Sequence, residues 1–133
     1  NQNVHAIRIA KHELLQGDAF KQLQRLADQG LRFDMVILDP PAFAKRQSEV
    51  ARAMEAYYRL TILGLGVLQK DGILVSASCS SRVKAEDFFR IVNKAAIERR
   101  RPLSEIERTG HPVDHPIGFR EGAYLKCLFA RAM

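Results

Sequence analysis

The sequence has little or none of several features that would assign it to a class directly. Its 133 residues include two cysteines and no tryptophan. The cysteines are far apart, which excludes a disulfide framework and a zinc knuckle and favours a reducing, cytoplasmic setting. No apolar run approaches the eighteen residues that a membrane span needs, and no basic-then-apolar leader is visible. The sequence therefore predicts neither a membrane partner nor a secretory signal.

A glycine-rich phosphate-binding turn is also missing, because neither GxGxxG nor GxGxG occurs. We therefore expect residues 1–133 to be a partial nucleotide-binding domain, the second part of a larger one, which binds its cofactor poorly alone. A metal centre is not predicted either. The H-x-x-D-H spacing of His111, Asp114 and His115 fits no strong zinc signature.

Positive charge exceeds negative charge. The net charge is +6 and the sequence pI is about 9.7. Such a balance favours polyanionic partners, because each Lys or Arg set against a phosphate releases a counterion. The densest basic run, 98–102, follows a predicted helix, where cations suit the negative end of the helix dipole. RNA is thus a candidate partner, although charge alone does not select it.

Strand and helix patterns alternate along the first part of the chain. Residues 12–18 read as a short strand, and 19–30 read as an amphipathic helix that Asp18 caps and Gly30 closes. Residues 32–41 contain a continuous apolar run stopped by Asp-Pro-Pro. Continuous apolarity predicts a strand buried on both faces, as in a parallel sheet.

The alternation continues through the second part of the chain. We expect a helix at 48–69 with Ser48 as its N-cap, a strand at 71–78, a helix at 83–100, and strands at 103–109 and 123–132. On the last strand, Cys127 alternates with Leu125 and Phe129, and we assign all three to the core. The adjacent tyrosines 57 and 58 are interpreted as helix packing.

This order of elements predicts an α/β fold: a doubly wound Rossmann-like sheet, mostly parallel with an antiparallel last strand. Ligands bind such sheets at the carboxyl ends of the strands. Three polar elements fall at those ends, namely Gly17-Asp18, Asp39-Pro40-Pro41 and Ser78-Cys79-Ser80. We expect all three on one rim of the sheet.

Each motif has a structural and a functional interpretation. Asp39-Pro40-Pro41 can be a strand-ending turn or a stiff ledge that presents a carboxylate, and it is followed by Phe43, which can stack, and Lys45, which can bind phosphate. Cys79 can be a small buried side chain or a nucleophile, and a helix starting near Val83 would favour its anion.

The stretch "ILDPPAFAK" resembles the motif after the fourth strand of class I S-adenosylmethionine-dependent methyltransferases. More narrowly, "LDPPAFAKRQ", "SASCSS" and "DHPIGFREGAYLKCL", in this order, resemble the ribosomal RNA large subunit methyltransferase family that makes 5-methylcytosine. The resemblance covers nearly all of the chain. It implies S-adenosylmethionine as cofactor and ribosomal RNA as substrate.

The resemblance also implies roles for single residues. Cys79 would attack carbon 6 of cytosine, and Asp39 would contact the polar edge of the pyrimidine. The cofactor would be held by Asp18, Ala19, Asp39 and Pro40. The substrate side would include Pro41, Phe43, Lys45, Tyr124 and Lys126, with Asp114, His115 and Glu121 as weaker candidates. The base that removes the carbon-5 proton is not named by the resemblance.

Other functions remain open. A methyltransferase acting on a base nitrogen, guanine N7 or adenine N6, shares the DPP motif, although Ala42 stands where adenine enzymes usually have an aromatic residue. A noncatalytic RNA-binding module is a further alternative. The strand order of the resembling fold would leave the strand at 33–39 with an open apolar edge. From this we expect self-association or a rearranged N-terminal segment.

Overall fold

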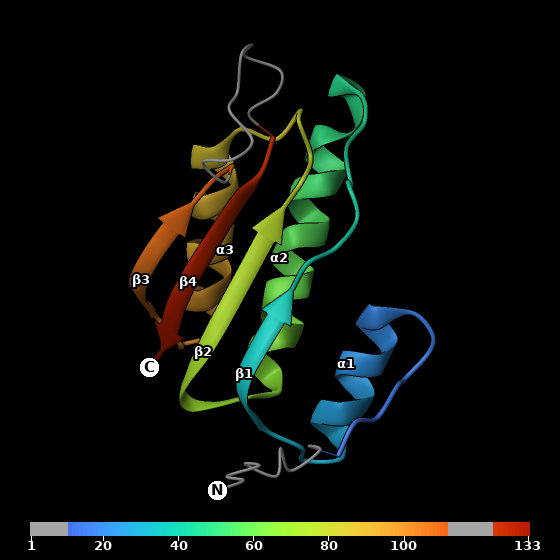
Figure 1. The fold of residues 1–133 in the computed structure, drawn as a ribbon, viewed down its shortest axis with the longest axis vertical. Helices are drawn as coiled ribbons and strands as arrows, with labels where there is room; N and C mark the ends of the chain where they lie inside the picture. The colour runs from blue at the N-terminus through green and yellow to red at the C-terminus, as the bar shows by residue number, and fades with distance from the viewer. Residues whose placement is uncertain (1–10, 112–123) are drawn as a thin grey trace, which may run out of the picture.

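The computed structural model describes residues 11–111 and 124–133, and within them the chain forms one mixed sheet with helices packed against it (Figure 1). The sheet order is β1-β2-β4-β3. The elements are α1 (Ala19–Asp28), β1 (Phe33–Leu38), the short 3₁₀ helix η1 (Gln47–Glu49), α2 (Val50–Gly66), β2 (Leu68–Ser78), α3 (Ala85–Glu98), β3 (Leu103–Thr109) and β4 (Lys126–Ala132).

Strand direction confirms the predicted fold class. β1 and β2 are parallel, whereas β4 is antiparallel to both of its neighbours, β2 and β3. Three strands thus run one way and β4 runs against them (Figure 1). β4 is inserted between two strands that precede it in the sequence, β2 and β3.

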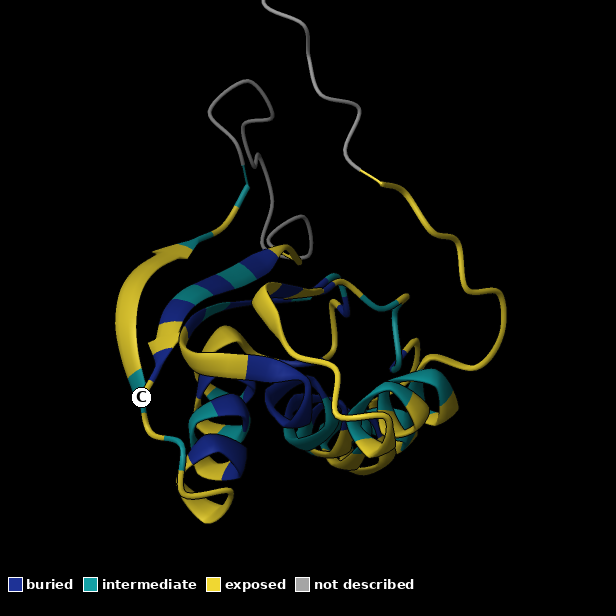
Figure 2. Cartoon of the chain, turned by 90° about the horizontal axis from the view of Figure 1, so that it is seen from below, coloured by how far each residue is buried: buried dark blue, intermediate teal, exposed yellow. Residues whose placement is uncertain are grey.

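The helices α1, α2 and α3 all lie on one face of the sheet (Figure 2). The expectation that β1 is buried on both faces was therefore wrong. Val36 and Leu38 point to the helices and are buried, whereas Met35 and Ile37 are 53% and 64% exposed on the other face. Nothing in the described residues covers that second face of β1, so its apolar run is only half buried.

The inward face of β4 was also assigned wrongly. The buried residues of this strand are Lys126, Leu128, Ala130 and Ala132. Cys127 and Phe129 are half-buried on the opposite face, and Leu125 is exposed. A strand alternates its side chains, and the helices cover only the face that carries the even-numbered set.

Several elements also differ from expectation. The helix expected at 48–69 ends at Gly66, β2 begins at Leu68 and not at 71, and β4 begins at Lys126 and not at 123. Residues 11–16 form no strand and are exposed, because no neighbouring strand in the described residues offers them a hydrogen-bond ladder. Ser48 is not the cap of the long helix. It lies within η1, and α2 begins two residues later at Val50.

The caps of α1 are confirmed. Asp18 Oδ1 accepts from the backbone N–H of Phe20 at 2.8 Å and of Lys21 at 3.3 Å. Gly30 follows the helix with a φ of +73°, a conformation that favours glycine. These contacts fix where the chain enters and leaves the helix beside β1.

Arg101 joins the ends of several elements. Its guanidinium donates to the carbonyl oxygens of Leu65 at 2.9 Å, Leu68 at 2.5 Å and Gln69 at 2.6 Å, and more weakly to those of Ala132 and Met133 at 3.4 Å. The sequence interpretation of residues 98–102 as cations for their own helix end did not include this role. Arg101 instead satisfies carbonyls at the end of α2 and the start of β2.

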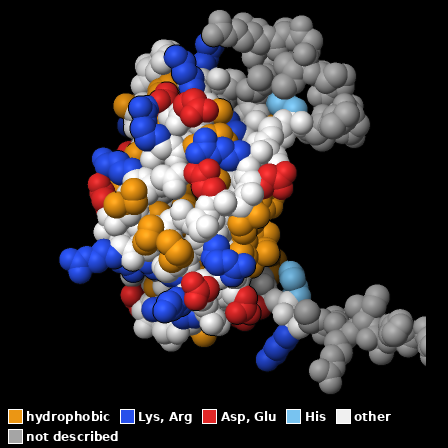
Figure 3. Space-filling view, turned by 90° about the vertical axis from the view of Figure 1, so that its left-hand side faces the viewer, with side chains coloured by type: hydrophobic (Ala, Val, Ile, Leu, Met, Phe, Trp, Pro, Cys, Tyr) orange, Lys and Arg blue, Asp and Glu red, His pale blue; other side chains and the backbone are white. Residues whose placement is uncertain are grey.

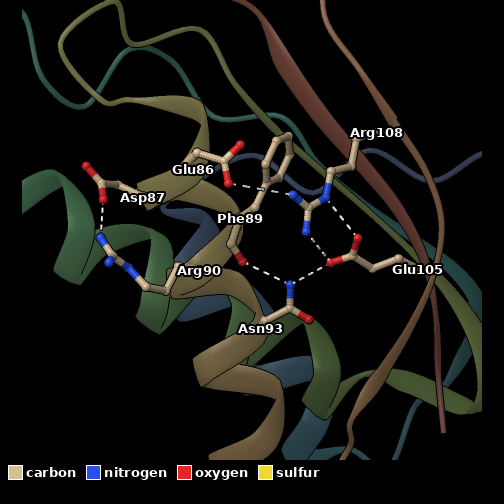
Figure 4. Close-up of polar contacts among 7 residues, drawn as sticks. All are labelled: Glu86, Asp87, Phe89, Arg90, Asn93, Glu105 and Arg108. Carbon is tan, nitrogen blue, oxygen red and sulfur yellow. Dashed lines mark hydrogen bonds and ion pairs between the residues drawn. The ribbon is translucent and has the colours of Figure 1, made fainter.

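A polar network ties α3 to β3 (Figure 4). Arg108 donates two hydrogen bonds to the Glu105 carboxylate, at 2.8 and 2.7 Å, and its guanidinium lies 4.4 Å from the centre of the Phe89 ring. Asn93 bridges the Phe89 carbonyl and Glu105. On the side of the molecule formed by α3 and β3, acidic and basic side chains are interspersed (Figure 3). The described residues on this side therefore form no patch of a single sign of the kind that nucleic acid would favour.

Candidate functional site

The ends of β1 and β2 lie side by side at one rim of the sheet, as predicted. These strands are parallel neighbours, with Leu38 opposite Ser76, so Asp39-Pro40 and Ser78-Cys79-Ser80 leave the sheet together. The Cys79 thiol points to the Pro40 carbonyl oxygen, with 3.9 Å between sulfur and oxygen. The structure thus brings the two strongest sequence motifs into contact.

A buried hydroxyl cluster holds these two loops in place. Ser80 Oγ accepts from the backbone N–H of Phe43 at 3.0 Å and of Ala44 at 3.4 Å. The Tyr57 hydroxyl lies 2.9 Å from Ser80 Oγ and 2.8 Å from Ser78 Oγ. Because all three hydroxyls are buried, each needs a partner, and each finds it in the cluster.

Tyr57 is the functional-site residue that sequence reasoning missed. Its ring packs in the core as predicted, 4.9 Å from Phe43 and 5.2 Å from Phe88 between centroids. Its hydroxyl, however, links the DPP loop to the cysteine loop. The available signal was that a buried tyrosine usually finds a hydrogen-bond partner for its O–H.

One cavity of about 640 Å³ is lined by all four residues that were predicted to hold the cofactor. It lies between the start of α1 and the end of β1, and Asp18, Ala19, Asp39 and Pro40 line it. Pro41 and Phe43, predicted on the substrate side, line it as well. Its remaining wall is mostly apolar and includes Leu15, Leu23, Leu26 and Leu60. Apolar walls with a few carboxylates suit a small ligand that has a flat ring and polar edges.

Lys126 has an unusual environment. The side chain is 4% exposed, and its Nζ donates to the Ser80 carbonyl at 2.6 Å and to the Tyr124 carbonyl at 3.1 Å. Burial lowers the pKa of the Lys126 amine to about 8, and Cys79 acts in the opposite direction. Among the described residues no carboxylate forms an ion pair with it.

The other predicted substrate residues are spread more widely. Lys45 is exposed, and its backbone N–H donates to Glu49 Oε2 at 2.8 Å. This bond and one from the Arg46 N–H lower the pKa of the Glu49 carboxyl. Tyr124 packs its ring edge-on against His111 at 4.7 Å between centroids. The predictions for Asp114, His115 and Glu121 fall outside the described residues.

The half-buried Cys127 lies on the face away from the helices. Burial raises the pKa of its thiol, and the nearby Asp39 carboxylate adds to this effect. In the part of the chain that the structure describes, no cluster of three or more His, Cys, Asp or Glu side chains could hold a metal ion. No helix there is long and apolar enough to cross a membrane.

Comparison with known sequences gives relatives over the whole chain but no matching family model. A protein of Klebsiella pneumoniae subsp. pneumoniae named "Ribosomal RNA large subunit methyltransferase I" is 33% identical over 135 aligned positions. A protein of the same name from Aliivibrio fischeri is 35% identical. Each match takes in 100% of this chain but 34% of the relative. The chain therefore spans about one third of the length of these relatives.

Comparison with solved structures agrees on the fold. A methyltransferase complexed with SAH superposes with a TM-score of 0.77 at 23% identity, over 92% of this chain and 32% of that protein. A SAM-dependent methyltransferase from Streptococcus mutans gives 0.76 at 21% identity, over 92% and 31%. The chain thus has the mixed α/β fold of SAM-dependent methyltransferases, and its sequence relatives are named as ribosomal RNA large subunit methyltransferases.

Proposed function

We propose that this chain is the second part of the catalytic domain of an S-adenosylmethionine-dependent RNA methyltransferase that acts on carbon 5 of cytosine in large-subunit ribosomal RNA. The observation that carries the proposal is the contact of the Cys79 thiol with the Pro40 carbonyl. It sets a nucleophile beside the carboxylate-bearing DPP loop. The names of the sequence relatives support the substrate class.

In this proposal Cys79 activates the base. Carbon 5 of cytosine is a poor nucleophile, and a thiolate that bonds to carbon 6 pushes the ring electrons onto carbon 5. Asp39, exposed at the end of β1, contacts the polar edge of the ring and stabilises the adduct. Carbon 5 would then bond to the methyl group of the cofactor, whose sulfonium sulfur would keep the electron pair of the broken bond. Loss of the carbon-5 proton then restores the double bond as the thiolate leaves.

The cavity beside α1 suits the proposed cofactor. Its carboxylates can accept hydrogen bonds from amino and hydroxyl groups, and its leucines can cover a flat ring. We assign Asp18, Ala19, Asp39 and Pro40 to this role. Bound S-adenosylmethionine would supply an electrophilic methyl group there. Because the chain has no glycine-rich turn, we expect these 133 residues alone to bind the cofactor weakly, and calorimetry showing micromolar affinity would contradict this.

The decisive experiment uses the full-length protein with large-subunit ribosomal RNA. We expect Cys79→Ala to abolish methyl transfer, and we expect the unmodified protein to form a covalent adduct with RNA containing 5-fluorocytosine. Cys127→Ala is the matched control and should keep activity. Unchanged methylation by Cys79→Ala would instead favour transfer to a base nitrogen. Salt-dependent RNA binding without any methyl transfer would favour a noncatalytic RNA-binding module.

We further propose that the 133-residue chain self-associates through β1. Within residues 11–111 and 124–133, this strand is at the edge of the sheet, and its exposed residues include Phe33, Met35 and Ile37. An unpaired strand edge next to an exposed apolar face is a template for pairing with a second copy. Light scattering that shows a monomer at high concentration would contradict this proposal.

A further inference from the structure

Lys126 is a buried amine, and no carboxylate in the described residues is paired with it. Its Nζ has two acceptors, the carbonyls of Ser80 and Tyr124. Two donors suffice for these carbonyls, so a neutral amine keeps a free lone pair, and an ammonium keeps a free N–H. Burying a charge without a counter-ion is costly, and such a group marks a functional-site candidate.

The position of Lys126 in the sheet puts it next to the cysteine loop. It is the register partner of Ser78, the residue before Cys79, and it bonds the carbonyl of Ser80, the residue after it. The carbonyl oxygen of Pro40, which faces Cys79 Sγ, stabilises a thiol and repels a thiolate. Forming the thiolate therefore needs a positive group close by.

We propose that Lys126, in its neutral amine form, accepts the proton of the Cys79 thiol and then remains beside the thiolate, as an ammonium group, to act as its counter-ion. The proton moves from Sγ to Nζ, which leaves a sulfur anion and an ammonium group, and no other reactant is needed. This inference rests on the proposed role of Cys79 as nucleophile. It makes Lys126 a positioning and activating residue, in place of the RNA contact that the sequence resemblance implied.

Other ionisable groups near the two loops are less suited to the role. Asp39, after β1, is negative and would oppose the thiolate. His111, after β3, uses its Nε2 to accept from the backbone N–H of Tyr124 and Leu125, at 3.2 Å each. The Tyr57 hydroxyl is hydrogen-bonded to the hydroxyls of Ser78 and Ser80. Lys84, which precedes α3, is exposed to solvent. Among the described residues, the basic side chain that is both buried and bonded to the cysteine loop is Lys126.

The pKa of the Lys126 amine fits this exchange. Burial brings it to about 8, below the ordinary lysine value of about 10.4, so that more of the amine is in the neutral form that can accept a proton. An exposed lysine, with a pKa near 10.4, would act as a counter-ion but would give up its own proton far less readily.

The test is the pH dependence of iodoacetamide alkylation at Cys79 in the full-length protein, followed by peptide mass mapping. We expect Lys126→Met to raise the alkylation midpoint by about one pH unit or more, which lowers the rate at pH 7 about tenfold. Lys126→Arg keeps a charge and should keep a low midpoint. It cannot accept a proton, however, and should therefore lose methyl transfer.

Three controls make the result specific. Lys70→Met removes an exposed lysine from the far end of β2 and should leave the Cys79 midpoint unchanged. Alkylation of Cys127 in the same samples should not respond to Lys126→Met. Lys126→Gln keeps donors for the Ser80 carbonyl, so it should reproduce the shift seen in Lys126→Met if charge, and not packing, is the cause.

An unchanged midpoint in a folded Lys126→Met protein would overturn the proposal. Weaker RNA binding by Lys126→Met with an unchanged alkylation midpoint would also overturn it. Lys126 would then be interpreted as a residue that binds an RNA phosphate. This alkylation test can fail or succeed independently of the methylation test of the proposed function. If Cys79→Ala kept full methylation, the catalytic role of the cysteine would fail, while the alkylation profile would still report on the lysine–thiol pair.

Discussion

Phe43 and Ser80, which are 37 residues apart in the sequence, are joined by a hydrogen bond of 3.0 Å from the Phe43 backbone N–H to Ser80 Oγ. The same oxygen accepts from Ala44 and contacts the Tyr57 hydroxyl. One serine hydroxyl thus sets the distance between the DPP loop and the cysteine loop.

Ser80→Ala should therefore destabilise the protein and loosen the site. The substitution leaves the Phe43 N–H and the buried Tyr57 hydroxyl without one of their partners, which costs about 1–3 kcal/mol in the free energy of unfolding. Urea denaturation would measure the loss. Ser81→Ala, at the exposed neighbouring position, is the control and should stay within about 0.5 kcal/mol of the unmodified chain. Equal stability of both variants would contradict the role given to Ser80.

Lys126 should make stability depend on pH in the alkaline range. Its folded pKa of about 8 lies below that of an unfolded lysine, so between about pH 8 and 10.5 the unfolded chain binds more protons. The folded state is therefore penalised below pH 8, and this penalty disappears as the pH rises through 10.5.

We expect the stability of Lys126→Met, relative to the unmodified chain, to fall by up to about 3 kcal/mol between pH 7 and pH 10.5. Lysines and tyrosines that do not interact with Lys126 cancel in this comparison, and making it in a Cys79→Ala background removes the thiol that does interact with it. Urea denaturation of the two proteins at several pH values gives the difference directly. A difference that is flat across this range would show that Lys126 titrates as an exposed lysine does.

Arg101→Met should be costly although the residue is only half-buried. The change removes donors from the carbonyls of Leu65, Leu68 and Gln69. Hydrogen bonds from a charged donor contribute about 1.5–3 kcal/mol each, but water can replace some of them here, so we expect a loss of about 2–4 kcal/mol. Arg100→Met, next in the chain and exposed, should change the thermal midpoint far less.

Ile37→Lys tests self-association of the 133-residue chain. The side chain is 64% exposed, so the charge should leave the free energy of unfolding nearly unchanged. A charge on an edge strand opposes pairing with another strand, so concentration-dependent mass in light scattering should drop toward that of a monomer. Gln24→Lys on the exposed surface of α1 adds the same charge and should have no effect on mass. A mass that Ile37→Lys leaves unchanged would exclude β1 as the interface.

Much of the fold could be predicted because it rests on local patterns. Asp18 and Gly30 mark the ends of α1 by their chemistry, and Phe88 and Val92 lie on the buried face that helical spacing predicts. The errors concern which face is covered. A continuous apolar run in β1 and the alternation in β4 do not say on which side the helices pack, so Ile37 and Cys127 were assigned to the wrong environment.

The site could be predicted only where local sequence patterns mark it. Asp39 and Cys79 were found because strand ends carry ligand-binding residues in this kind of sheet. Tyr57 and Lys126 were assigned to other roles, because their contacts span 21 to 46 residues and depend on the packing of α2 and on the register of β4. No local pattern encodes such distances.

The place of β4 between β2 and β3 has a consequence for the order of folding. As the chain leaves the ribosome, β3 emerges before the only strand that pairs with it in the described sheet. The Lys126 bond to the cysteine loop can form only after that pairing strand has been made. The candidate active site is thus completed only after β1, β2 and β3 have been made, by insertion of a strand between β2 and β3. A chain stalled before residue 126 would present the cysteine without its lysine.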